Sequence, residues 1–114
     1  MSKFVVGEVL TLMLILGVPC THAADGSVVI EAPAEGATLK SKEKNQLVYA
    51  VNRGRKGDHV HVYVDAKEVA TLHRTKGAYL LKDLNAGPRE ICIKVVNKGH
   101  TPIGLARCIK VTVQ

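Results

Sequence analysis

Two histidines one residue apart are the side chains in this sequence best suited to chemistry. His59 and His61 alternate with valines in the segment 57–65, GDHVHVYVD. Strict alternation predicts a β-strand, in which residues two apart share one face of the sheet. Both imidazoles are therefore expected side by side on a solvent-facing surface, with Val60 and Val62 on the opposite face. Neutral imidazole is a common ligand of transition metals, so this strand predicts a site for Cu or Zn.

A closed metal site needs three or four ligands, and strand topology predicts two further histidines at the same place. In an antiparallel sandwich the histidine strand pairs with the penultimate strand, so its start lies beside the last loop, which carries His100. The strand 68–72 also runs antiparallel to the histidine strand, which returns His73 to this end. The predicted ligand set is His59, His61, His100 and His73. The face taken by His73 depends on the length of the turn at Asp65.

Basic loops at this same end allow a different interpretation. The chain carries a formal net charge of +6, and Arg53, Arg55 and Lys56 lie just before the histidine strand. Such a rim disfavours a free divalent cation and favours an anion, such as phosphate, a carboxylate or an acidic glycan. Three alternatives therefore stay open: a metal site, an anion or acidic-glycan site at the basic loop, and a solvated surface for structure or protein contact.

The charge also restricts the class of partner. An acidic periplasmic protein, an anionic glycan or a lipid surface would suit a basic domain. Nucleic acid is excluded as a partner, because the chain has one Phe, no Trp and no recognisable reader motif.

The elements that must position these residues are short strands. Runs rich in Val, Ile, Leu and Tyr are separated by Gly, Pro, Asn and Asp, and no long segment has apolar residues at helical spacing. This pattern predicts an all-β fold, an immunoglobulin-like or fibronectin type III-like β-sandwich of about seven strands. The expected strands cover residues 27–31, 37–39, 47–51, 57–65, 68–72, 77–81, 90–96 and 106–113.

Two cysteines fix the expected register of the last hairpin. In an exported domain, Cys92 and Cys108 are expected to form a disulfide. Pairing them across neighbouring strands also places Glu90 opposite Lys110, a favourable pair of charges. The same register centres the turn on His100.

The N-terminus predicts export. Lys3 precedes an apolar run at 9–18, Pro19 ends the run, and Ala23 supplies the small residue that a signal peptidase reads. We expect residues 1–23 to be a signal peptide and residues 24–114 to be one immunoglobulin-like domain, periplasmic or secreted. Cleavage would remove Cys20, and the mature chain would have no membrane span.

Catalytic signatures are weak in this sequence. Ser27 and Ser41 are the two serines of the expected mature chain, and both of its cysteines are expected to be oxidised. There is no H-E-x-x-H helix, nucleophile elbow or phosphate-binding loop. We therefore expect a non-catalytic binding or accessory domain rather than an enzyme.

Four short motifs add a resemblance. They are the H-x-H-x-x-V-D strand at 59–65, an L-x-x-G corner at 84–87, an H-x-P loop at 100–102 and a terminal I-x-V-T-V strand at 109–113. In these the chain resembles a family of uncharacterised exported bacterial domains of immunoglobulin-like fold, over about residues 27–113. The resemblance implies export and fold, and it implies no particular activity. Cys92 and Cys108 are not expected throughout that family.

Overall fold

The computed structural model describes residues 25–114. These residues form eight strands, of which β3, β7 and β8 are longer than six residues. Their bounds are β1 (Ser27–Ala32), β2 (Thr38–Leu39), β3 (Asn45–Asn52), β4 (His59–Val64), β5 (Lys67–Leu72), β6 (Lys76–Leu81), β7 (Gly87–Val96) and β8 (Pro102–Val113). The expected signal peptide and its cleavage site at Ala23 lie outside the described residues.

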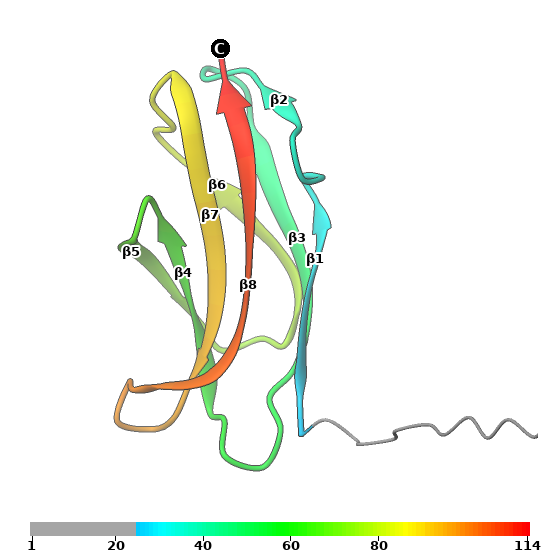
Figure 1. Cartoon of the computed structure of the whole chain (residues 1–114), viewed down its shortest axis with the longest axis vertical. Helices are drawn as coiled ribbons and strands as arrows, with labels where there is room; N and C mark the ends of the chain where they lie inside the picture. Colours follow the sequence, from blue (N-terminus) through cyan, green and yellow to red (C-terminus); the bar gives the residue numbers. More distant parts are fainter. Residues whose placement is uncertain (1–24) are drawn as a thin grey trace, which may run out of the picture.

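The strands form two sheets packed face to face. One sheet has the order β1-β3-β6 and the other has the order β2-β8-β7-β4-β5. All pairs are antiparallel except β2 with β8, which is parallel. In Figure 1 the long, curved strands β7 and β8 run side by side along the domain. The predicted all-β, immunoglobulin-like sandwich is confirmed, and β2 corresponds to the expected edge piece at 37–39.

Alternating side chains build the core between the sheets. Val60 and Val62 of β4 are fully buried, as are Ile91, Ile93 and Val95 of β7. Leu47 and Tyr49 of β3 cover them from the other sheet and are also buried, and the whole set belongs to one apolar cluster. Burying a Val, Leu or Ile side chain contributes about 1.5–3 kcal/mol. The core therefore holds the inner face of β4 firmly, which leaves the outer face to carry His59 and His61.

The last hairpin has the expected register over most of its length. Cys92 faces Cys108 and forms a disulfide with it, and Glu90 faces Lys110. The pairing shifts between Lys94 and Val96, because Val96 faces Pro102. The prediction that the turn centres on His100 is therefore wrong by one residue.

The shift has a local cause in β8. Between Ala106 and Pro102 this strand contains three residues, whereas β7 contains Val95 alone between the facing positions. The extra length includes Gly104, whose φ of 95° is a conformation that suits glycine. An irregularity of this kind bends a strand, and Figure 1 shows the start of β8 curving strongly toward the turn. The bend carries the β7–β8 turn across the outer face of the sheet.

Among the described residues, no helix has the length and apolar character needed to cross a membrane.

Candidate metal centre

His59 and His61 lie on the outer face of β4, as the alternation predicts. Their pairing partners on β7 are Val96 and Lys94, so the penultimate strand is the expected neighbour. The expectation that both imidazoles are solvent-exposed is wrong, because each residue is only 3% exposed. The reason is that the turn between β7 and β8 folds over this end of the sheet and covers both rings with His100.

Asn97 builds the turn that carries His100. Its side-chain oxygen accepts hydrogen bonds from the backbone N–H groups of Gly99, at 2.9 Å, and Thr101, at 3.0 Å. The N–H of His100 donates to the carbonyl oxygen of Asn97 at 2.9 Å. His100 itself has a φ of 68°, in the left-handed region that this turn requires. These bonds direct the imidazole of His100 back onto β4.

Three ring nitrogens converge at the centre of this cluster. Nε2 of His59 lies 3.2 Å from Nε2 of His61 and 3.2 Å from Nδ1 of His100. Nε2 of His61 lies 3.1 Å from Nδ1 of His100. The three atoms therefore form a nearly equilateral triangle. His59, His61 and His100 are a group whose donor atoms could hold one metal ion.

Hydrogen bonds cannot satisfy all three nitrogen–nitrogen contacts of this triangle. An imidazole nitrogen presents either one proton or one lone pair in the ring plane. Any assignment of protons to three nitrogens gives at most two donor–acceptor contacts among the three. At least one contact in the triangle therefore pairs two lone pairs or two N–H groups. A cation at the centre would instead receive a lone pair from every nitrogen.

Carboxylates lie behind two of the rings. Nδ1 of His59 is 2.8 Å from Oδ2 of Asp58, and Nδ1 of His61 is 3.4 Å from Oε1 of Glu68. A carboxylate only accepts, so the Nδ1 of His59 carries a proton, and in the neutral ring Nε2 then has a lone pair toward the triangle. Carboxylates that accept from the remote nitrogen of a ligand histidine are a common feature of metal sites.

Glu68 reaches this face because of a bulge between β4 and β5. Thr71 faces His61, but the register then shifts and Glu68, rather than Val69, faces Tyr63. The hydroxyl of Thr71 donates to Oε2 of Glu68 at 3.3 Å, which helps to orient the carboxylate toward His61. Sequence reasoning missed Glu68, because an unshifted hairpin would place it on the opposite face.

Burial, hydrogen bonding and neighbouring charges shift the pKa values of His61 and Asp58. Burial lowers the pKa of His61, the neighbouring His59 and His100 lower it further, and Glu68 opposes this effect. A lowered pKa keeps the ring neutral, which is the form that binds metals. The hydrogen bond from His59 lowers the pKa of Asp58, and the charges of Lys98 and Arg53 act in the same direction. Asp58 is therefore expected to be an ionised carboxylate.

His73 lies beside the cluster without joining the triangle. It follows directly after β5, and its ring centroid is 5.0 Å from that of His59 at an interplanar angle of 31°. The group of donor atoms close enough to share one ion contains His59, His61 and His100. The sequence-predicted ligand His73 is thus at the expected end of the sheet, where its ring lies against that of His59.

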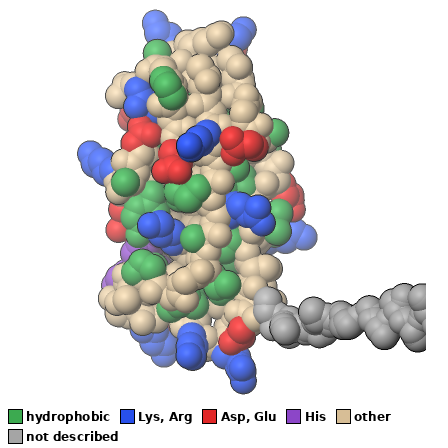
Figure 2. All heavy atoms as spheres, in the orientation of Figure 1, with side chains coloured by type: hydrophobic (Ala, Val, Ile, Leu, Met, Phe, Trp, Pro, Cys, Tyr) green, Lys and Arg blue, Asp and Glu red, His purple; other side chains and the backbone are tan. Residues whose placement is uncertain are grey.

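The predicted anion-binding residues each have a different environment. The guanidinium of Arg53 donates to the carbonyl oxygen of Asp58 at 2.6 Å. Arg55 is paired with Asp25 at 3.5 Å, although its side chain is 89% exposed. Lys56 is exposed and lies in the same loop. Among the described residues, the three side chains share no acceptor. Figure 2 shows the histidines at one margin of the molecule, with Lys and Arg side chains on either side of them.

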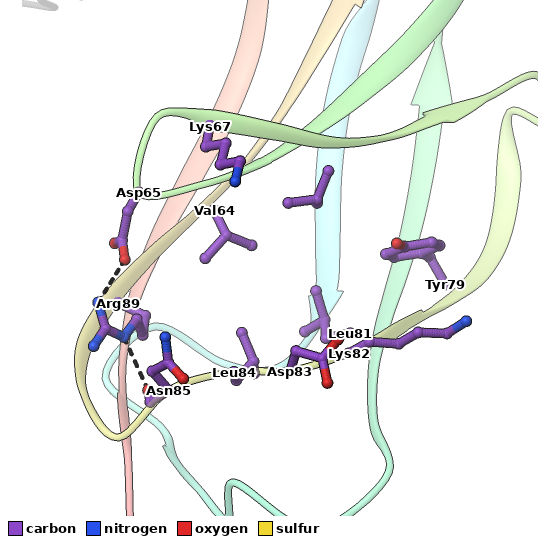
Figure 3. Close-up of a pocket in the computed structure, with 11 residues that line it drawn as sticks. Val64, Asp65, Lys67, Tyr79, Leu81, Lys82, Asp83, Leu84, Asn85 and Arg89 are labelled. Carbon is purple, nitrogen blue, oxygen red and sulfur yellow. Dashed lines mark hydrogen bonds and ion pairs between the residues drawn. The ribbon is translucent and has the colours of Figure 1, made fainter.

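An open pocket of about 660 Å³ lies at the opposite end of β4. Figure 3 shows Val64, Tyr79, Leu81 and Leu84 along its wall, and Arg89 at its rim. The guanidinium of Arg89 donates to Asp65 at 2.7 Å and to the carbonyl oxygens of Asn85 and Ala86, at 2.9 Å and 2.7 Å. The pocket is open to solvent. We call it the far pocket.

Comparison with family models and with curated proteins finds no match to this chain. Comparison with solved structures finds several similar folds. The fibronectin(III)-like modules of CbhA from Clostridium thermocellum superpose with a TM-score of 0.64 at 16% identity, over 76% of this chain and 96% of that one. A CARDB domain from Pyrococcus furiosus, solved in complex with di-metal ions, has a TM-score of 0.53 at 16% identity, over 78% and 92%.

A lytic polysaccharide monooxygenase from Jonesia denitrificans is also similar, with a TM-score of 0.52 at 19% identity, over 72% of this chain and 60% of that one. At such low identity these likenesses establish the fold alone. They agree with the resemblance to immunoglobulin-like domains that the sequence motifs indicated. The fold and the disulfide are both typical of extracellular domains.

Proposed function

We propose that this protein is a small exported, non-catalytic binding or accessory domain that holds one divalent transition-metal ion. His59 and His61 would bind the ion through Nε2, and His100 would bind it through Nδ1. The observation that carries the proposal is the triangle of three nitrogens at 3.1–3.2 Å, in which protons cannot satisfy all three contacts.

The shape of the triangle favours a tetrahedral ion. Nitrogens about 2.0–2.1 Å from a tetrahedral ion lie about 3.3–3.4 Å from one another, close to the observed edges. In a square-planar Cu(II) site, three nitrogens would include one pair about 4 Å apart, on opposite sides of the ion. Zn(II) is therefore the first candidate and Cu the second. A CARDB domain of similar fold that contains di-metal ions supports the idea that such a sandwich accommodates metal.

The basic surroundings do not prevent cation binding at this position. Asp58 and Glu68 contribute two negative charges directly behind His59 and His61, whereas the nearest arginine contact is from Arg53 to a backbone carbonyl oxygen. Neutral imidazoles add no charge, so the two carboxylates balance a divalent ion. The position of the two carboxylates therefore offsets the basic rim, which on sequence grounds disfavours a divalent cation.

Isothermal titration of the purified mature protein with Zn(II) and Cu(II) tests the proposal. We expect one ion per chain. His61→Ala and His100→Ala should each weaken Zn(II) binding more than about 100-fold, because losing a ligand should exceed the 10–100-fold cost of losing an outer partner. His73→Ala is the matched control and should change the affinity less than about threefold. Circular dichroism verifies that each variant folds, and His61→Asn offers a second replacement of similar shape.

Unchanged Zn(II) affinity in folded His61→Ala and His100→Ala variants would contradict the proposal. Equal losses in His73→Ala and His100→Ala would show that the ligand set differs from the triangle.

Binding of an acidic partner at the basic loop is the second candidate function. The 89% exposure of the Arg55 side chain supports it, since that guanidinium could contact an acidic glycan or protein. Such binding should weaken with salt and with Arg55→Ala, and it should not require metal. For the cellular location, we propose the periplasm, and intact mass of the exported protein, expected to begin at Ala24, tests this.

A further inference from the structure

We propose that the metal ion keeps one coordination position for a ligand from solvent, and that this ligand is a small anion. The inference rests on the proposed function, because it concerns the same three histidines. It brings together two features that the sequence presented as alternatives, the histidine cluster and the basic rim.

The described part of the chain, residues 25–114, supplies three ligand atoms at this point and no fourth. Within residues 25–114, the His, Cys, Asp and Glu atoms that come together at this point belong to His59, His61 and His100 alone. Asp58 and Glu68 are occupied behind the rings, on the Nδ1 atoms that point away from the triangle. A tetrahedral ion therefore has one position that only an external ligand can fill.

We expect the open position to face solvent on the side of the turn. His59 and His61 are buried, but His100 is exposed, as is its neighbour Lys98 in the same turn. His73, whose ring lies against that of His59, is exposed too. A small ligand can thus reach the ion past His100, whereas the core and the strands close the opposite side.

Charge determines what kind of ligand this position prefers. The two carboxylates balance the divalent ion, so the remaining charges near the site are those of the rim. Arg53 donates to the backbone carbonyl oxygen of Asp58, and the exposed Lys98 lies in the same turn as His100. Lys94 stands opposite His61 on β7, with its ammonium group 4.8 Å from the ring centroid of Tyr63. This excess of positive charge raises the local concentration of anions.

The basic residues do not form an anion site by themselves. Arg53 donates to a backbone carbonyl oxygen, Arg55 pairs with Asp25, and the ammonium group of Lys94 lies over an aromatic ring. These contacts leave no shared pocket of donors for one anion. Anion binding at this end is therefore expected to require the metal, with the rim acting by attraction at a distance.

Co(II) in place of Zn(II) provides the test, because four-coordinate Co(II) absorbs strongly in the visible range and its spectrum reports each ligand. The Co(II)-loaded protein is titrated with azide and, separately, with inorganic phosphate at constant ionic strength. We expect a saturable spectral change with at least one of the two probes. Lys98→Ala should weaken that anion about two- to fivefold, the range for one exposed charge pair, without weakening Co(II) binding. Lys42→Ala, in the loop between β2 and β3, is the matched control and should have no effect.

Three outcomes would overturn the inference. Co(II) could bind with a spectrum that neither anion alters, which would leave the proposed metal site standing and remove the open position. Calorimetry could show equal phosphate binding with and without metal, which would assign the anion to the basic loop. Failure of both Co(II) and Zn(II) to bind would instead contradict the proposed function itself.

Discussion

The histidine end of the domain and the far pocket both lie at the ends of β4 and β7, but their polar groups are paired differently. At the far pocket, Asp65 accepts from the backbone N–H of Glu90 at 2.9 Å and from Arg89 at 2.7 Å. Arg89 also donates to two backbone carbonyl oxygens. At the histidine end, three nitrogens face one another and protons cannot pair them all.

This difference in pairing suggests that the polar groups at the far pocket stabilise the fold, whereas the histidine cluster is suited to a ligand. Buried polar groups in folded proteins are normally hydrogen-bonded, so a convergent set that protons cannot satisfy needs an explanation. The far pocket is an obvious cavity, but the side chains of Arg89 and Asp65 are already paired with each other. At the histidine cluster, three ring nitrogens instead converge on one point. Size alone would have favoured the far pocket.

The disulfide lies between these two ends and gives the largest expected effect. Cys92, near the middle of β7, faces Tyr63 of β4, and the bridge joins it to Cys108, 16 positions further along the chain. Replacing both cysteines by Ala should lower the free energy of unfolding by about 2–4 kcal/mol, measured by urea denaturation of the metal-free protein. Zn(II) affinity should change little, because the strand pairing and the Asn97 turn position the histidines.

Reduction of the wild-type protein with dithiothreitol is the control and should give the same loss of stability. If the double variant instead loses metal binding while it stays folded, the bridge positions the histidines and the two ends are not independent.

Removal of the carboxylates behind the rings gives the next largest effect. Asp58→Ala should weaken Zn(II) binding about 10–100-fold, because the Nδ1 proton of His59 loses its acceptor. Asp58→Asn should recover part of this loss, since the amide oxygen can still accept from His59. Calorimetric titration measures both variants. Arg89→Ala is the control from the far pocket: it should lower stability and leave the metal affinity unchanged.

A drop in metal affinity for Arg89→Ala equal to that of Asp58→Ala would contradict the separation of the two ends. It would indicate that any loss of stability weakens metal binding.

The sequence predicted most of the fold and the three histidines that converge at this site, but it did not predict the position of Glu68. Alternation in β4 placed His59 and His61 on one face, and the cysteine pair fixed the register of the last hairpin as far as Lys94. Antiparallel pairing with β7 brought His100 to the same end. These features follow from the period of a strand and from simple pairing rules.

The parts that could not be predicted depend on irregularities in strand pairing. One shift, between Val62 and Tyr63, brings Glu68 to the histidine face, and another, before Val96, bends β8 and moves the turn. A bulge changes which face a side chain takes, and no residue pattern here specified either one. The burial of His59 and His61 follows from the second shift, which explains why the sequence predicted an exposed surface.

The smallest expected effect concerns pH and the far pocket. The hydrogen bond from the backbone N–H of Glu90 lowers the pKa of Asp65 below its ordinary value of 3.8, and Arg89 lowers it further. A lowered pKa in the folded state means that the carboxylate stabilises the fold above the unfolded value, and that this stability is lost as pH falls through the folded value. Because the Asp65 side chain is 40% exposed, the contribution should not exceed about 1 kcal/mol.

Urea denaturation of metal-free wild type and Asp65→Asn measures this contribution. The variant should be less stable near neutral pH, and the difference should shrink as pH falls below about 4, where the wild-type carboxylate takes up its proton. Zn(II) affinity at neutral pH should be the same in both proteins, because Asp65 lies at the end of β4 away from the histidines. A stability difference that stays constant with pH would show that Asp65 acts through its hydrogen bonds alone, while altered Zn(II) affinity would show that the two ends of β4 are coupled.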